Sequence, residues 1–149
     1  MEYLSTRGSP LAITSKKAMI KGIAEDNGLY FPSNFPHLGD AVLKSSEQES
    51  YVSRATKILR ALLTDFSTDE LDAACRKAYS DNFDTPAVAP LRFLGDRLGV
   101  LELWHGPTLA FKDMALQLMP WLLKTAILSE KDPYQMVILV ATSGDTGKA

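Results

Sequence analysis

Cysteine and histidine are scarce in this sequence of 149 residues, which holds one cysteine, Cys75, and two histidines, His37 and His105. A single cysteine excludes a framework of internal disulfide bonds and fits a protein of the reducing cytoplasm. The three residues lie far apart along the chain, and no pair of them has the spacing of metal ligands. We therefore expect a cytoplasmic protein without a metal site.

An excess of charge of one sign is also missing, and so are long apolar runs. The formal net charge is only −2 and no stripe of Lys and Arg is present, so nucleic acid is not an expected partner. No apolar run is long enough to cross a membrane, and residues 1–7 lack the apolar stretch of a signal peptide. Hydrophobic residues nevertheless make up 46% of the chain, which is enough to form a core.

The first part of the chain is predicted to be a small, mainly helical domain over residues 1–90. We expect a short helix over residues 14–23 and a turn into an extended segment at residues 28–32. Residues 51–63 carry apolar side chains at helical spacing, which predicts an amphipathic helix with one buried face.

Ser67 and Glu70 have the spacing of a capping box, which predicts the start of another helix. This helix should bury one apolar stripe, in which Cys75 is a core residue rather than a nucleophile. The stripe consists of Leu71, Ala74, Cys75, Ala78 and Tyr79.

Pro86 and Pro90 flank a predicted domain boundary, after which residues 91–149 begin an incomplete α/β domain. An apolar helix is expected over residues 114–128. Pro120 should kink it, because proline removes a backbone donor and crowds the preceding turn. Asp132 and Pro133 then predict a turn.

Residues 136–141 form a nearly continuous apolar run, which is typical of a strand buried on both faces. Together with a strand-like segment at 100–104 and the helix between them, this run predicts a βαβ unit with a right-handed crossover. Ligands of open α/β sheets bind at the carboxyl ends of the strands. Two polar loops, residues 105–113 and 142–147, follow those ends.

Loop 142–147 combines small residues with hydroxyl side chains and should open a helix, where free backbone N–H groups favour a carboxylate or phosphate. The alternative is an ordinary turn from strand to helix, capped by Ser143 or Asp145. A nucleotide P-loop is excluded, because the required first glycine is a threonine here and an alanine follows the lysine.

Lys112 stands between Phe111 and the apolar helix that begins near Met114. Partial shielding from water and a helix start both disfavour the ammonium form, and an uncharged amine can attack an aldehyde. Asp113 acts in the opposite direction or simply favours the first turn of the helix. The alternative is that Lys112 is a surface lysine on a polar loop.

Residues 102–113, Glu-Leu-Trp-His-Gly-Pro-Thr-Leu-Ala-Phe-Lys-Asp, closely resemble the threonine synthase segment whose lysine forms a Schiff base with pyridoxal phosphate. Residues 141–147 resemble the next block of that family. Residues 3–8 and 28–32 look like its N-terminal blocks. Four blocks in the same order over the whole chain make the resemblance specific.

The resemblance implies a fold-type-II pyridoxal-phosphate enzyme that converts O-phospho-L-homoserine and water to L-threonine and phosphate. It implies that Lys112 holds the cofactor and shuttles protons, with Phe111 and Asp145 also at the cofactor. The residues implied to bind the substrate are Thr142, Ser143, Gly144, Asp145 and Thr146.

Threonine synthases continue with a glycine-rich loop for the cofactor phosphate, so we expect these 149 residues to be the N-terminal part of a longer chain and inactive alone. Unpaired sheet edges near residues 137–141 would favour self-association. Two alternatives stay open: another phospho-lyase or fold-type-II enzyme of threonine-synthase-like sequence, and a non-catalytic, self-associating domain. Arg7 either reaches a substrate phosphate or forms an ion pair.

Overall fold

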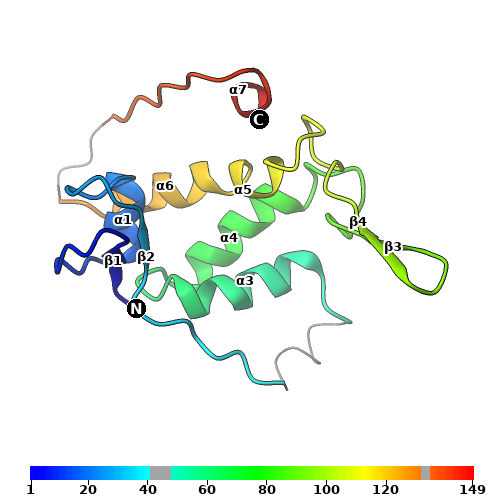
Figure 1. Ribbon diagram of the computed structural model, residues 1–149, viewed down its shortest axis with the longest axis horizontal. Helices are drawn as coiled ribbons and strands as arrows, with labels where there is room; N and C mark the ends of the chain where they lie inside the picture. Colours follow the sequence, from blue (N-terminus) through cyan, green and yellow to red (C-terminus); the bar gives the residue numbers. More distant parts are fainter. Residues whose placement is uncertain (41–47, 132–134) are drawn as a thin grey trace.

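The computed structural model describes residues 1–40, 48–131 and 135–149. The turn predicted at Asp132 and Pro133 lies outside these residues. Figure 1 shows a helical body, a β-hairpin that projects from one end of it, and a C-terminal segment that runs along one side. No helix in the described ranges is long and apolar enough to cross a membrane.

The N-terminal residues form a small antiparallel pair, in which β1 (Tyr3–Ser5) pairs with β2 (Tyr30–Pro32). Helix α1 (Ser15–Lys21) lies between them in the sequence. It begins where the Thr14 side chain accepts a hydrogen bond from the backbone of Lys17, and it ends at Gly22, whose φ of 71° favours glycine. The predicted short helix and extended segment are both confirmed.

Helices α3 (Tyr51–Leu62) and α4 (Thr68–Tyr79) form a hairpin. The predicted capping box is present: the Glu70 backbone donates to the Ser67 hydroxyl over 3.2 Å, and the Ser67 backbone donates to the Glu70 carboxylate over 2.6 Å. The predicted apolar stripe of α4 is fully confirmed, since its buried residues are Leu71, Ala74, Cys75, Ala78 and Tyr79.

The predicted helix over residues 114–128 is two helices, α5 (Asp113–Leu116) and α6 (Met119–Leu128). Pro120 lies in the first turn of α6, where its missing N–H would have had no helical partner. The chain therefore breaks before the proline instead of bending at it. Helix α6 packs against α1 and α4, and its buried Leu122 and Ala126 complete the core.

The predicted parallel βαβ unit is not formed. The segment expected as a strand at 100–104 overlaps β4 (Leu98–Leu101), which pairs with β3 (Leu91–Leu94) in an antiparallel hairpin. Residues 136–141 are not a strand, and Leu139 is 91% exposed instead of buried. A strand exists only through hydrogen bonds to a neighbour, and no described segment offers its edge to residues 136–141. The predicted mixed α/β class is confirmed, but the predicted parallel βαβ unit within it is wrong.

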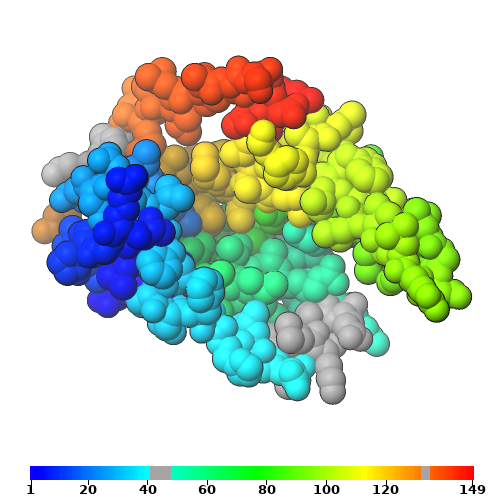
Figure 2. All heavy atoms as spheres, in the orientation of Figure 1, coloured from blue at the N-terminus to red at the C-terminus, as the bar shows by residue number. Residues whose placement is uncertain are grey.

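The last helix, α7 (Asp145–Lys148), follows the extended residues 135–144. Figure 2 shows this C-terminal segment, in orange and red, above the helical body, with its end over the yellow region around α5. The two polar loops singled out in the sequence therefore lie on the same side of the molecule, although no parallel sheet places them there.

Candidate active site

The loop that leads into α5 is wound by consecutive turns. The backbone of Leu109 donates to the carbonyl of Gly106 over 3.1 Å, and the backbone of Asp113 donates to the carbonyl of Ala110 over 3.0 Å. Leu109 has a φ of 60°, in the left-handed region that non-glycine residues rarely adopt. The segment is therefore compact and locally strained.

The side chain of Asp113 is fully buried and turns back over this loop. Its two carboxylate oxygens accept hydrogen bonds from Thr108, one from the backbone N–H over 2.9 Å and one from the hydroxyl over 2.7 Å. Gly106 lies so close that a Cβ there would be 2.4 Å from Asp113 Oδ2, so only glycine fits. From the sequence, Asp113 was expected either to act as a charge near Lys112 or to favour the first turn of the helix, and its contact with Thr108 was not predicted. The Thr-to-Asp spacing of five residues was the signal available for this contact.

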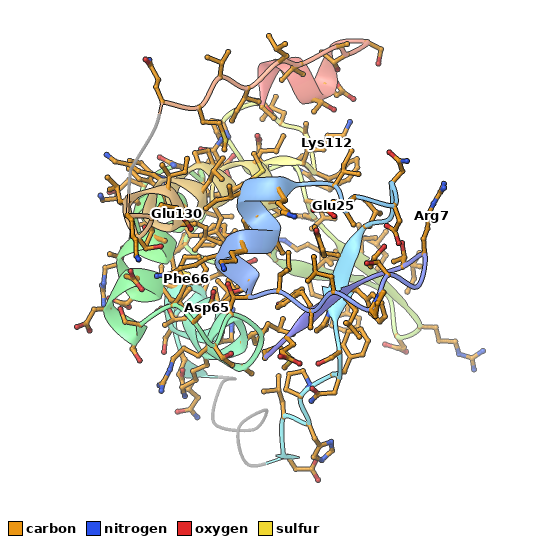
Figure 3. The ribbon with its side chains drawn as sticks, turned by 90° about the vertical axis from the view of Figure 1, so that its left-hand side faces the viewer. Arg7, Glu25, Asp65, Phe66, Lys112 and Glu130 are labelled. Atoms are coloured by element: carbon orange, nitrogen blue, oxygen red, sulfur yellow. The ribbon has the colours of Figure 1, made fainter. Side chains whose placement is uncertain are left out.

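Lys112 directly precedes α5 in helical conformation, and its side chain is half-buried. Its Nζ lies 5.5 Å from the centroid of the Phe111 ring, and Phe111 itself is exposed. Within the part of the chain that the structure describes, Lys112 forms no ion pair. Figure 3 places Lys112 on the side of the molecule that carries the C-terminal segment. The expected position at a helix start is thus present, but the shielding from water is only partial, because Lys112 is half-buried and Phe111 is exposed.

Loop 142–147 opens a helix, as expected, but neither Ser143 nor Asp145 caps it. Gly144 is the residue before α7, with a φ of 140° and no side-chain cap. Its N–H donates to the Thr142 hydroxyl over 3.2 Å. Asp145 lies 3.6 Å from Lys148 Nζ, and the residues of the loop are exposed except for the half-buried Thr146. The predicted substrate-binding groups are therefore accessible to a ligand.

His105, whose role the sequence left open, bridges two carboxylates. Its Nδ1 lies 2.5 Å from Asp84 Oδ1 and its Nε2 lies 2.8 Å from Glu102 Oε2. These hydrogen bonds, with Glu102 contributing most, raise the pKa of His105 above its ordinary value of 6.5. The backbone of Asp84 also donates to the His105 carbonyl over 3.0 Å. His105 thereby ties the loop of Lys112 to the end of the helical region.

Arg7 is exposed, and Figure 3 shows its side chain extending away from the body of the molecule. It forms no ion pair with any described residue. The turn that carries it is held by Asp26, whose carboxylate accepts from the Ser5 hydroxyl over 2.6 Å and from the Ser9 backbone over 3.1 Å. The Ser5 bond is the main cause that lowers the pKa of Asp26. A contact of Arg7 with a substrate phosphate stays a prediction.

A family profile described as "Threonine synthase N terminus" matches residues 2–79, which is more than half of the chain. The chain belongs to the threonine synthase family. It is 36% identical to the threonine synthase of Schizosaccharomyces pombe over 157 aligned residues and 39% identical to that of Pseudomonas aeruginosa over 152. It is also 40% identical over 136 residues to the human protein called threonine synthase-like 1, covering 89% of this chain and 18% of that protein.

Solved threonine synthases share the fold. The pyridoxal-phosphate-bound enzyme of Brucella melitensis matches with a TM-score of 0.81 and 34% identity, covering 86% of this chain and 28% of that one. The Escherichia coli enzyme matches with a TM-score of 0.75 and 28% identity, covering 85% and 28%. The 149 residues cover 30% of the S. pombe threonine synthase and 31% of the P. aeruginosa one, while all of this chain is covered in both cases.

Among the described residues, no group of three or more His, Cys, Asp and Glu side chains is arranged to hold a metal ion. The predicted site residues supply the amine of Lys112 and the exposed amides and hydroxyls of residues 142–147. These groups can bind an aldehyde and an anion.

Proposed function

We propose that these residues are part of a pyridoxal-phosphate-dependent threonine synthase, which converts O-phospho-L-homoserine and water to L-threonine and phosphate. The observation that carries the proposal is the position of Lys112, a half-buried residue directly before α5 whose amine forms no ion pair within the described residues. An amine that is not paired with a carboxylate is available to react with an aldehyde.

The residues around Lys112 fit the cofactor. The Phe111 ring, 5.5 Å from Nζ, offers an apolar surface beside the amine. Helix α7, whose first residue is Asp145, lies on the same side of the molecule as Lys112 (Figure 3). When bound, pyridoxal phosphate supplies an electron sink for the carbon next to the substrate's amino group. Lys112 would hold the cofactor, and its amine would also move protons at the substrate carbons.

The substrate carboxylate is assigned to Thr142, Ser143, Gly144, Asp145 and Thr146. The Thr142 hydroxyl uses its oxygen to accept from the Gly144 N–H, so its hydrogen stays available to an anion. The backbone N–H groups at the start of α7 are unpaired within the helix, as at every helix start. These donors together give a carboxylate several partners.

The partner of this site is a small molecule in the proposal, and the compartment is the cytoplasm, because the lone thiol of Cys75 fits a reducing environment. We also propose that residues 1–90 and 91–149 belong to two successive domains. Since residues 1–149 span only about 30% of the length of the S. pombe threonine synthase, we expect them alone to bind the cofactor weakly and to be inactive.

A second candidate is a threonine-synthase-like phospho-lyase. The identity to the human threonine synthase-like 1 protein, 40%, is as high as that to the threonine synthases. The intact gene product separates the two candidates when it is given O-phosphohomoserine. Release of phosphate together with threonine supports the synthase, and release of phosphate without threonine supports the phospho-lyase.

The test of Lys112 is its modification in the intact gene product. The protein is mixed with pyridoxal phosphate, the adduct is fixed by borohydride, and peptides are mapped by mass spectrometry. We expect the label on Lys112, and its loss in Lys112→Ala but not in Lys124→Ala, a control on α6. If the label is spread evenly over the lysines of the wild-type protein, Lys112 is not the cofactor lysine and the proposal fails.

A further inference from the structure

Asp113 is the only carboxyl side chain that is fully buried within the described ranges. A buried carboxylate is costly unless its oxygens are hydrogen-bonded. Here both oxygens accept from a single residue, Thr108, at 2.9 and 2.7 Å. The side chain of Asp113 therefore joins the two ends of the segment 108–113 before α5. It forms no ion pair with any described residue.

Apolar burial at the tip of this loop is small. Leu109 and Phe111 at its tip are exposed, at 69% and 63%, so they contribute little apolar burial. The positive φ of Leu109 costs free energy, because the left-handed region crowds the Cβ atom of a non-glycine residue. The two Asp113–Thr108 hydrogen bonds span this strained residue and, with the turn hydrogen bonds of the loop, offset its cost.

We call the two hydrogen bonds between Thr108 and Asp113 the clamp. Lys112 lies between these two residues, directly before Asp113. On its other side, α5 is fixed by the Tyr79 hydroxyl, which donates to the Met114 carbonyl over 2.7 Å. The backbone of Lys112 is thus held from both directions, by Thr108 through Asp113 and by Tyr79 through Met114. An amine that must meet one face of a cofactor gains rate from such fixed placement.

We propose that Asp113, acting through Thr108, is a positioning residue for Lys112. The inference rests on the proposed function, because it gives Asp113 a role only if Lys112 is the reacting amine. The close approach of Gly106 to Asp113 Oδ2, which leaves no room for a Cβ, belongs to the same clamp.

The test uses the intact gene product, pyridoxal phosphate with a mild reductant, and the rate of labelling at Lys112 relative to Lys124. Thr108→Val removes the hydroxyl donor at a half-buried site and keeps the volume. Thr108→Ser restores the donor. Asp113→Asn keeps both contacts, since its amide can accept from the Thr108 N–H and donate to the Thr108 hydroxyl. Thermal unfolding of each variant is measured in parallel.

We expect Thr108→Val to slow the labelling of Lys112 on the order of 10-fold with Lys124 unchanged, and Thr108→Ser and Asp113→Asn to keep it near wild type. A merely structural role would change the unfolding temperature but would not give this pattern of loss and rescue at one lysine. Unchanged labelling in Thr108→Val, or equal loss in Thr108→Ser, overturns the inference while Lys112 stays the cofactor lysine. Equal labelling of Lys112 and Lys124 in the wild type overturns the proposed function as well.

Discussion

Tyr79, the last residue of α4, donates a hydrogen bond from its phenolic hydroxyl to the backbone carbonyl of Met114 in α5, over 2.7 Å. Its ring is buried and packs edge-on against Tyr51 at 5.0 Å between centroids. Burial raises the pKa of Tyr79, so the hydroxyl stays a neutral donor at all ordinary pH values. This contact joins the end of α4 to the segment that carries Lys112.

Tyr79→Phe should lower the free energy of unfolding by about 1 kcal/mol, because the ring packing is kept while a buried carbonyl loses its donor. Urea unfolding measures the change as a lower midpoint with an unchanged slope. Tyr30→Phe is the matched control, since the Tyr30 hydroxyl forms no hydrogen bond in the part of the chain that is described. Equal midpoints for the two variants would show that the bond to Met114 contributes nothing to stability.

Ser67→Ala should destabilise the chain by about 1 kcal/mol, the usual effect of removing an N-cap side chain. The mutation removes the acceptor of the Glu70 backbone N–H and disrupts the capping box of α4. Ser80→Ala at the other end of the same helix is the control, because its hydroxyl has no partner among the described residues. Chemical denaturation of both variants checks the prediction, and an equal effect would contradict it.

The capping box and the buried stripe of α4 could be predicted because both are local: the partners are at most a few residues apart and share one helix. The same holds for α1. The effect of Pro120 was predicted only in part: a kink within one helix was expected, whereas the proline lies in the first turn of a second helix. Local backbone preferences decide such features before any tertiary contact forms.

The contacts around Lys112 could not be predicted in this way. Tyr79 and Met114 are 35 residues apart, and His105 and Asp84 are 21 apart, so no short pattern connects them. The apolar run at 136–141 has the composition of a buried strand, but composition does not supply the neighbour that a strand needs. Lys112 itself was predicted from the resemblance of its segment. The Thr108–Asp113 contact spans only five residues, but the sequence analysis did not predict it.

The stability of the chain should decrease as the pH rises above about 6.5, through His105. The folded state raises the pKa of His105 by hydrogen bonds to Glu102 and Asp84, so the folded state binds the proton more tightly than the unfolded state. This contribution is fully present below pH 6.5 and is lost as the pH rises through the folded-state pKa.

An NMR titration of the His105 ring measures this pKa directly, and Asp84→Asn should move it down towards the ordinary value. In the same variant, the fall of the unfolding temperature between neutral and mildly alkaline pH should become smaller than in the wild type. A His105 resonance that titrates at or below 6.5 in the folded wild-type protein contradicts the prediction.

Residues 1–149 on their own should self-associate through the exposed apolar run at Val137, Ile138, Leu139 and Val140. The backbone of this extended segment is unpaired and its sequence favours β-structure, so two copies can pair their edges. Leu139→Lys places a charge at its most exposed position and should shift the chain towards monomer in sedimentation velocity over a range of concentrations. Leu128→Lys tests the mechanism, because Leu128 is also exposed, at 62%, but belongs to helix α6, whose backbone is already paired. Association that is reduced equally by both variants would point to apolar contact in general and would contradict pairing of strand edges.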